Sequence, residues 1–171
     1  MDLRLANISD LSKLKTMYGN IIDTMNSNNI PIWDEIYPYK FFNDDIENNR
    51  LYLLLEEHGD IVAAFALSDS HAGESYVKRE NAHDKALYLD RFGVNVNYMR
   101  RGIGSIMLKH AITLTKQNNV KYLRLFVVDI NKPAINVYLK NGFKQVDGIY
   151  YERVDDDLIF REYGFEIKVL R

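Results

Sequence analysis

The sequence predicts a single α/β (α+β) domain that spans residues 1–171. Apolar runs of strand length alternate along the chain with amphipathic stretches of helix length, and turn or cap residues separate them. A chain of 171 residues that is 47% hydrophobic and 27% charged fits one domain with a buried core. The expected order is strand, two helices, hairpin, strand, helix, strand, helix and two strands, which makes about seven strands.

The N-terminal third is expected to form a strand and two helices. Residues 3–6 read as a short strand, and Asn7 or Ser9 can cap the first helix, with Asp10 in its positive first turn. One apolar stripe marks that helix: Leu11, Leu14, Tyr18, Ile21, Ile22 and Met25. A second helix is expected from about residue 40 to residue 49, and its inward side chains are Phe41, Phe42 and Ile46.

The middle of the chain predicts a hairpin and a loose connection. Apolar runs at 51–56 and 61–68 flank Gly59, which is typical of an antiparallel hairpin closed by a glycine turn. Residues 69–85 are polar and aperiodic, so we expect a mobile connection there. His71 and His83 lie in this stretch without a compact ligand spacing and are expected at the surface.

Residues 98–105 join a predicted strand at 86–94 to a predicted helix and form the chain's main candidate for anion binding. The helix is indicated by an apolar face at helical spacing: Ile103, Met107, Ala111 and Leu114, with Ile106 and Leu108 beside them. Gly102 and Gly104 remove side chains where the first amides of that helix point outward, so a phosphate can approach them. Arg100 and Arg101 add positive charge.

The C-terminal third continues the alternation of strands and helices. After a strand at 122–129, Asn131 can cap a helix with Pro133 in its first turn, and Asn141-Gly142 ends that helix. Residues 143–146 and 164–170 read as two further strands. Asp155-Asp156-Asp157 is expected in an exposed turn.

Composition excludes several classes of protein. The sequence contains no cysteine, which rules out disulfides, thiolate zinc sites and a cysteine nucleophile. A net charge of −2 and a pI near 6.1 argue against nucleic-acid binding. The N-terminus lacks an apolar leader and no run approaches the length of a membrane span, so we expect a soluble, cytoplasmic protein without a membrane partner.

Two separate segments resemble the GNAT superfamily of acetyl-CoA-dependent N-acetyltransferases. The first is Phe92-Gly93-Val94 followed by Arg101-Gly102-Ile103-Gly104, and the second is Asn131-Lys132-Pro133-Ala134 followed by Tyr138 to Phe143. The similarity is best over about residues 86–143. Met99 stands where the family usually has Gln or Arg, although the cofactor pyrophosphate is held mainly by backbone amides.

The resemblance implies a mixed central sheet flanked by helices, with two splayed parallel strands, about 86–94 and 122–129, that form the coenzyme A groove. Gly93 fits a bulge that opens the gap, and the N–H of Val94 or Phe92 is a candidate oxyanion donor. No metal is implied. The residues implied in acetyl-CoA binding are Phe92, Val94, Met99, Arg100, Arg101, Gly102, Ile103, Gly104, Ser105 and Asn131.

The resemblance also implies catalytic residues. Tyr138 stands where the family places a tyrosine that protonates the leaving thiolate, a task that suits a phenol with an ordinary pKa of about 10. Tyr88 and Asp90 share one face of their strand, and Asp90 is the candidate base that takes the amine proton through water. The alternative for Asp90 is a solvated carboxylate or one paired with Arg91.

The acceptor side is expected on the loop 30–39, which the family places over the amine site. Trp33, Tyr37 and Tyr39 would wall that site, and Asp34 with Glu35 would attract a cation. The alternative is that these rings only cover the sheet.

The function implied is transfer of an acetyl group from acetyl-CoA to a primary amine of a small molecule or peptide, directly within a ternary complex, with a homodimer as an expected assembly. A catalytically silent acyl-CoA-binding or sensing domain is the alternative of another class, and it would need neither Tyr138 nor Asp90. A dinucleotide-binding oxidoreductase would need a glycine at position 107, which is Met107.

Overall fold

A computed structural model describes residues 1–170, and they form two compact units. The first unit contains residues 1–67 and 91–110, and the second contains residues 68–90 and 111–170. Strand β5 (Ala86–Val94) and helix α3 (Ile103–Gln117) each contribute residues to both units. Each unit is described by itself below.

The strands form a mixed sheet in the order β1-β2-β3-β5-β6-β10-β7, with β9 paired to β10, so the predicted fold class is confirmed. The bounds are β1 (Asp2–Leu5), β2 (Leu51–Leu55), β3 (Ile61–Ser68), β6 (Tyr122–Val128), β7 (Lys144–Gln145), β9 (Tyr150–Arg153) and β10 (Ile159–Lys168). Two short strands, β4 (Val77–Lys78) and β8 (Asp147–Gly148), pair separately. The hairpin β9–β10 was not predicted, because the sequence analysis began the last strand at residue 164.

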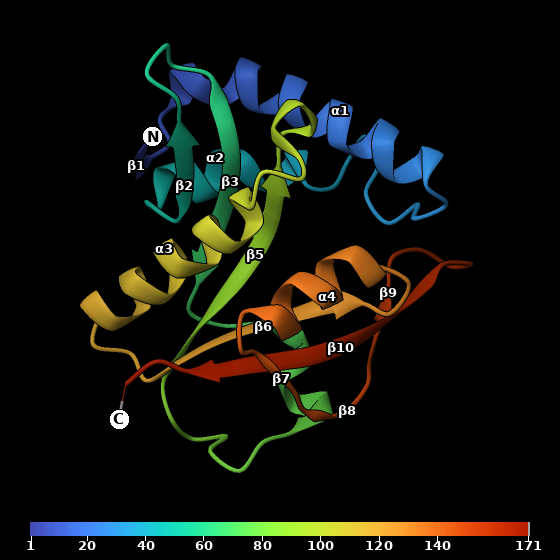
Figure 1. The fold of residues 1–171 in the computed structure, drawn as a ribbon. Helices are drawn as coiled ribbons and strands as arrows, with labels where there is room; N and C mark the ends of the chain where they lie inside the picture. Colours follow the sequence, from blue (N-terminus) through green and yellow to red (C-terminus); the bar gives the residue numbers. More distant parts are fainter. Residues whose placement is uncertain (171) are drawn as a thin grey trace. The chain divides into compact units, whose positions relative to one another are not determined.

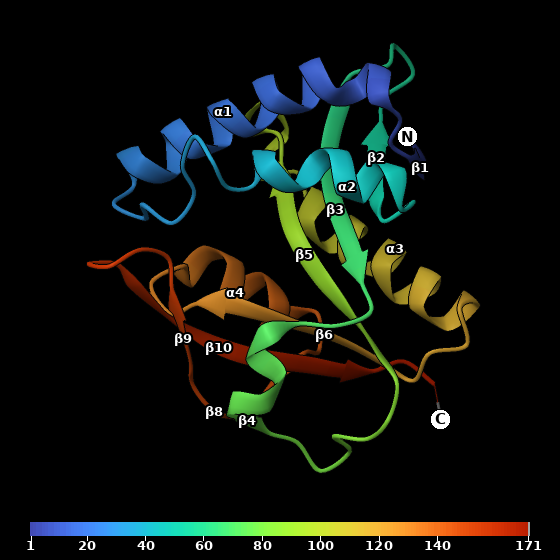
Figure 2. The ribbon, with the colours of Figure 1, turned by 180° about the vertical axis from the view of Figure 1, so that it is seen from behind.

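In the first unit, helices α1 (Leu11–Ser27) and α2 (Phe42–Glu47) cover one face of β2 and β3 (Figures 1 and 2). The 3-10 helices η1 (Ile8–Asp10) and η2 (Tyr39–Phe41) lead into them. Asn7, one of the two predicted cap residues, starts η1, and it forms a capping box with Asp10 that was not predicted. The buried side chains of α1 are Leu14, Met17, Tyr18, Ile21 and Ile22, so the predicted stripe is confirmed except that Met17 was missed.

In the second unit, α4 (Lys132–Lys140) covers one face of β6 and β10, and the 3-10 helix η3 (Ala72–Tyr76) covers the other (Figures 1 and 2). Asn131 caps α4 through its side chain, and Gly142 follows the helix with a φ of 87°, as the stop signal predicted.

The predicted mobile connection at 69–85 contains regular structure, so that prediction was wrong. It forms η3 and β4 and supplies two members of a buried ion network. Arg79 and Arg124 each contact both Glu74 and Glu166, at N···O distances of 2.9 to 3.2 Å. Part of the polar composition of this stretch reflects charges that are paired inside the unit, namely those of Glu74 and Arg79.

The parallel strands β5 and β6 are registered only near their N-terminal ends. Pairs join Ala86 to Tyr122, Leu87 to Leu123 and Tyr88 to Arg124, while β5 runs on to Val94 and β6 to Val128. This is the register that the predicted splayed strands require. The last registered pair lies two residues before Asp90.

Arg91 carries the irregular backbone of β5, not Gly93 as predicted. The φ of Arg91 is 51°, a left-handed conformation that a non-glycine residue rarely adopts. Its carbonyl accepts a hydrogen bond from the Tyr18 hydroxyl, and its guanidinium contacts the Asp45 carboxylate with a shortest N···O distance of 2.6 Å. Gly93 serves packing instead, because a Cβ there would lie 3.0 Å from Ile21 and 3.1 Å from Tyr18.

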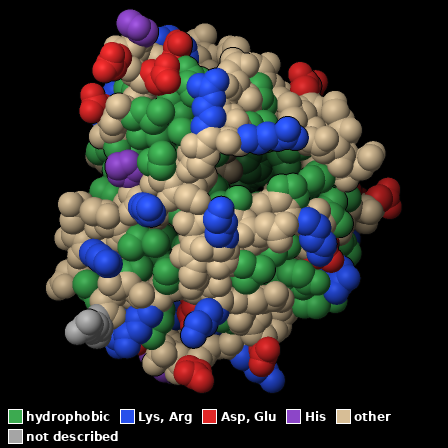
Figure 3. Space-filling view, in the orientation of Figure 1, with side chains coloured by type: hydrophobic (Ala, Val, Ile, Leu, Met, Phe, Trp, Pro, Cys, Tyr) green, Lys and Arg blue, Asp and Glu red, His purple; other side chains and the backbone are tan. Residues whose placement is uncertain are grey.

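The surface is mixed in character. Figure 3 shows basic, acidic and apolar side chains interspersed over its visible face, in keeping with a net charge of −2. Within residues 1–170 there is no helix whose length and apolar character would let it cross a membrane.

We predict that Asp45→Asn lowers the free energy of unfolding by about 3 kcal/mol, because removing a buried charge leaves its partners uncompensated. The Asp45 side chain is 2% exposed and contacts both Arg91 and Arg50. The matched control is Asp44→Asn, since Asp44 also pairs with Arg50 but is 63% exposed, and its loss should cost less than about 1 kcal/mol. Urea unfolding of both variants checks this, and equal losses would contradict it.

Candidate active site

The loop before α3 presents backbone to solvent. The 3-10 helix η4 (Val96–Tyr98) separates β5 from this loop, and α3 begins at Ile103, between the two glycines of the motif. Gly102 has a φ of 75°, and a Cβ placed on it would meet no atom within 4 Å. The first amides of a helix have no acceptor within it. The loop therefore has room for a ligand that accepts hydrogen bonds from backbone amides.

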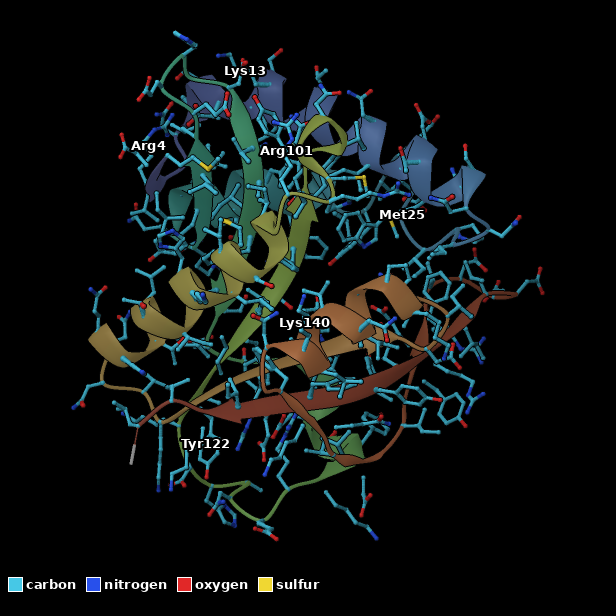
Figure 4. All side chains as sticks on the ribbon, in the orientation of Figure 1. Arg4, Lys13, Met25, Arg101, Tyr122 and Lys140 are labelled. Carbon is cyan, nitrogen blue, oxygen red and sulfur yellow. The ribbon has the colours of Figure 1, made fainter. Side chains whose placement is uncertain are left out.

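Positive charge surrounds that loop. Met99, Arg100, Arg101 and Gly102 are all exposed, and the Arg101 guanidinium lies 5.3 Å from the ring centre of Tyr98 (Figure 4). Helix α3 is 15 residues long, so its dipole adds partial positive charge at its start. Open backbone, two arginines and a helix start together suit a diphosphate.

Phe92 and Val94 lie on β5 on either side of Gly93. Because Gly93 faces Tyr18 and Ile21 of α1, the side chains of Phe92 and Val94 point to the opposite face of the strand. Both residues lie in the first unit, just before η4. The sequence predicted that backbone groups of Phe92 and Val94 border the cofactor, and this stays a prediction.

Tyr138 and Asn131 lie on α4 in the second unit. The Tyr138 side chain is 6% exposed and packs on Phe143 and Phe165, with ring centres 5.9 and 6.2 Å apart. Asn131 accepts the amide of Ala134 at 3.3 Å, so its side-chain oxygen starts the helix. The packing of Tyr138 holds its ring in one place.

Asp90 lies at the C-terminal end of the part of β5 that belongs to the second unit. One carboxylate oxygen, Oδ2, accepts a 2.7 Å hydrogen bond from the Ser68 hydroxyl, and the other, Oδ1, lies 4.0 Å from Nε2 of His71. The guanidinium of Arg91 contacts Asp45, and the alternative of an Arg91-paired Asp90 carboxylate stays open beside that of a solvated one. The Asp90 side chain is 14% exposed, which is compatible with a reacting group.

His71 was predicted at the surface, and that prediction was wrong. Its ring stacks on Phe126 with centres 4.3 Å apart and planes 11° apart, and Tyr88 and Tyr150 lie about it at 6.0 and 6.1 Å. Its Nδ1 accepts the amide of Gly73 at 3.0 Å. No sequence motif marks His71, because the rings that hold it come from three distant strands. His83 is exposed, as predicted.

Glu162 lies close to Asp90, and Glu152 lies next to Glu162. The pKa of Glu162 is raised to about 9, chiefly by burial, then by the neighbouring carboxylate of Glu152, to which protonated Glu162 can donate, and by the charge of Asp90. Glu162 therefore keeps its proton at neutral pH. The sequence analysis missed this pair, because the predicted last strand began after Glu162 and left Glu152 unassigned.

Tyr88 is buried beside the ion network of the second unit. Burial raises its pKa above the ordinary value, with the neighbouring Arg124 opposing the shift and Glu74 adding to it. A phenol that holds its proton more tightly is a poorer base at neutral pH. Of the two candidate bases on β5, Asp90 is the better one.

The predicted acceptor loop packs against the first unit. Trp33 lies 5.5 Å from Tyr18 and 6.2 Å from Tyr37 between ring centres, and the Tyr39 hydroxyl donates to the carbonyl of Lys15. Asp34 accepts the amides of residues 36 and 37, so its carboxylate shapes the loop. These contacts establish a structural role for the loop, and its role in acceptor binding stays a prediction.

The predicted site residues fall into two sets. The phosphate loop, Phe92, Val94 and the aromatic loop lie in the first unit, whereas Tyr88, Asp90, Asn131 and Tyr138 lie in the second. Within the second unit, Ser68, His71 and Glu162 lie near Asp90, and the sequence analysis did not predict these three neighbours. Among residues 1–170, no group of three or more histidines or acidic residues could hold a metal ion.

Comparison with known proteins identifies the class. The model of the acetyltransferase (GNAT) family matches residues 18–143. An N-alpha-acetyltransferase of Sulfurisphaera tokodaii is 30% identical over 125 residues, 72% of this chain and 74% of that protein. YwnH of Bacillus subtilis, provisionally named a phosphinothricin acetyltransferase, is 24% identical over 147 residues, 85% of each chain.

A solved structure shares the fold. Arabidopsis thaliana NAA60 in complex with a bisubstrate analogue aligns with a TM-score of 0.70 at 18% identity, over 98% of this chain and 97% of that one. Fold, helix-start loop and family match together define a transferase of acyl groups. The chain belongs to the acetyltransferase (GNAT) family, whose members use acetyl-CoA.

We predict that Glu162→Gln stabilises the protein more at pH 8.5 than at pH 5. Folded Glu162 holds its proton up to about pH 9, whereas an unfolded glutamate releases it near pH 4.3. Between these values the unfolded chain binds fewer protons, so the stability of the wild type falls as pH rises, and glutamine removes that fall.

Thermal unfolding at the two pH values checks this prediction. The expected gain in midpoint for Glu162→Gln is several degrees larger at pH 8.5 than at pH 5. The control is Glu57→Gln, because Glu57 is exposed, and its effect should be the same at both pH values. An equal gain for Glu162→Gln at both pH values would show that Glu162 ionises normally.

Proposed function

We propose that this protein is an N-acetyltransferase that moves the acetyl group of acetyl-CoA to a primary amine of a small molecule or peptide, directly in a ternary complex. The observation that carries the proposal is the position of Asp90, which is held by Ser68 two residues past the last registered pair of β5 and β6. A base at this point would meet an amine where the two parallel strands separate.

Tyr138 supports the proposal from the opposite face of the same sheet. It packs on Phe165, while Glu162, close to Asp90, projects from the other face of β10 because alternate residues of a strand point to opposite faces. A base on one face and an acid on the other suit a reaction in which the amine enters from one face and the thiol leaves on the other.

The loop before α3 would hold the cosubstrate. The amides around Gly102 and Gly104 would bind the pyrophosphate, with Arg100 and Arg101 adding charge, and backbone groups of Phe92 and Val94 would bind the pantetheine arm. Acetyl-CoA supplies the acetyl group as an activated thioester. The fit is supported by the open space at Gly102 and by the positive φ of Arg100, 62°.

The proton accounting fits these residues. The acceptor ammonium loses two N–H bonds while a C–N bond forms to the acetyl carbon and the C–S bond breaks. Asp90 takes one of these protons and passes it to solvent, and Tyr138 gives its proton to the leaving sulfur and is reprotonated by the second proton that the acceptor releases. The net products are the acetylated amine, the free thiol and one proton.

The acceptor class is supported by the relatives. One relative is named an N-alpha-acetyltransferase and another carries the name of a small amino compound, so the shared feature is a primary amine. A screen would follow thiol release from acetyl-CoA with three kinds of acceptor: a short peptide with a free N-terminus, 1,4-diaminobutane and free amino acids. If none of these amines causes release of the thiol from acetyl-CoA, the proposal is overturned.

A cytoplasmic location, a homodimer and one domain over residues 1–171 stay predictions from the sequence. Sedimentation of the purified chain tests the dimer directly.

We predict that Gly102→Ala weakens coenzyme A binding at least tenfold, because its Cβ would occupy the open space where the phosphates bind. The matched control is Gly59→Ala in the hairpin turn. Gly59 has a φ of 81° and an equally open Cβ position, so both variants carry the same backbone strain. Calorimetry should find weakened binding for Gly102→Ala alone, and unchanged binding in that variant would move the phosphate site elsewhere.

We predict that Tyr138→Phe lowers turnover about 100-fold and leaves coenzyme A affinity within a factor of about two. Phenylalanine keeps the packing on Phe143 and Phe165 and removes only the proton donor, and loss of a general acid has effects of this size. Steady-state kinetics on the best acceptor of the screen measures it. Turnover at the level of the wild type would mean that another group protonates the sulfur.

A further inference from the structure

His71 presents one particular nitrogen to Asp90. Its Nδ1 accepts the backbone amide of Gly73 at 3.0 Å, so the lone pair of Nδ1 is used in that bond. In a neutral imidazole the hydrogen must then lie on the other nitrogen, Nε2. The atom that lies 4.0 Å from Oδ1 of Asp90 is therefore a hydrogen-bond donor.

The ring of His71 has little freedom to turn away. It stacks on Phe126 and lies between Tyr88 and Tyr150. Gly73, whose amide His71 accepts, also lies against these rings, since a Cβ on it would lie 2.7 Å from Phe126 and 2.9 Å from Tyr150. Both the ring and the turn that holds it are thus fixed against the sheet.

The distance between the two groups suits one water molecule. A separation of 4.0 Å between Nε2 and Oδ1 is too long for a direct hydrogen bond. An oxygen atom about 2.8 Å from each of them completes a triangle with acceptable hydrogen-bond lengths. Asp90 cannot swing away to close the distance without losing the 2.7 Å hydrogen bond that its Oδ2 accepts from Ser68.

We propose that His71 is a positioning residue for the reaction: in the neutral state its Nε2–H orients the water through which Asp90 removes the proton of the acceptor amine. The inference rests on the proposed function for the identity of the reaction. It adds a residue that the family motif does not include and that belongs to this chain's own segment between β3 and β5.

The proton step at this water is balanced. An N–H bond of the acceptor ammonium breaks and its proton joins the water, while the water gives a proton to Oδ1 of Asp90. Nε2 of His71 only donates a hydrogen bond, so its own N–H bond remains. Asp90 later releases the proton to solvent.

Other titratable groups also face Asp90. Glu162 on β10 lies close to Asp90, and Glu152 on β9 lies next to Glu162. Tyr88 lies on β5, the strand of Asp90, and Tyr150 lies beside His71. Burial is the first cause of the raised pKa values of Glu162, Tyr88 and Tyr150, so these three stay protonated at neutral pH. They would not produce an acidic limb in the activity profile at neutral pH or below it.

Two variants separate positioning from a structural role. In His71→Asn the short amide can still accept the Gly73 amide as a cap but cannot reach Asp90 with a donor. In His71→Gln the terminal amide can place a donor near the position of Nε2 but no longer caps η3. If His71 positions the water, His71→Asn should be the poorer catalyst. If His71 has only a role in folding, His71→Gln should be the less stable protein.

The expected result is a shift in the pH profile of kcat/KM. With the best acceptor of the screen, His71→Asn should lower kcat about tenfold and move the acidic limb to higher pH, because a carboxylate that loses a donor holds its proton more tightly. His71→Gln should keep the limb near that of the wild type. A wild-type profile in His71→Asn, or equal losses in both variants, would overturn the proposal.

A second measurement needs no acceptor. The protein has four histidines, and nitrogen-15 NMR of labelled imidazoles reports which ring nitrogen carries the hydrogen. The signal that disappears in His71→Asn identifies His71, and it should show hydrogen on Nε2. Hydrogen on Nδ1 would overturn the proposal. If the wild type transfers acetyl to no amine while this signal is as expected, the proposed function fails and the geometry at His71 stands.

Discussion

The left-handed backbone of Arg91 is the constraint on which the first unit's part of this site depends. A non-glycine residue keeps that conformation only where its surroundings hold it. Here the Tyr18 hydroxyl binds the Arg91 carbonyl, Asp45 binds the guanidinium and the ring of Phe41 lies 4.9 Å from it. These contacts come from α1, η2 and α2, so within the first unit the N-terminal helices hold the backbone of Arg91 in this conformation.

The second unit shows how a chain can place a base without a sequence motif. Ser68 ends β3, His71 begins η3 and Asp90 lies on β5, yet the three meet because η3 packs on the face of β6 and β10. That packing depends on Gly73, where any side chain would collide with Phe126. The buried guanidinium groups of Arg79 and Arg124 also hold the segment at 69–85, through their ion pairs with Glu74 and Glu166.

Local signals in the sequence predicted most elements. The cap at Asn7, the hairpin at Gly59 and the Asn131 to Gly142 helix follow from contacts within a few residues, and the structure has all three. The two motifs around Gly102 and Asn131 together predicted the family for the same reason.

What could not be predicted depends on contacts between distant residues. Residues 69–85 look solvated because their charges find partners only after folding, as Glu74 does with Arg124. Gly93 was expected to bend β5, but the bend lies at Arg91, whose partners are 46 and 73 residues away. His71 was predicted at the surface because the ring that it stacks on, Phe126, is distant in the sequence and no neighbouring residue indicates the contact.

In the proposed function, the backbone before and at the start of α3 binds the cosubstrate. Hydrogen exchange of the backbone amides with and without coenzyme A tests this binding site, since bound phosphates occupy amides that otherwise exchange with water. We expect slower exchange for residues 100–106, with no change in the β2–β3 turn at 56–60. Unchanged exchange at 100–106 with coenzyme A bound would contradict it.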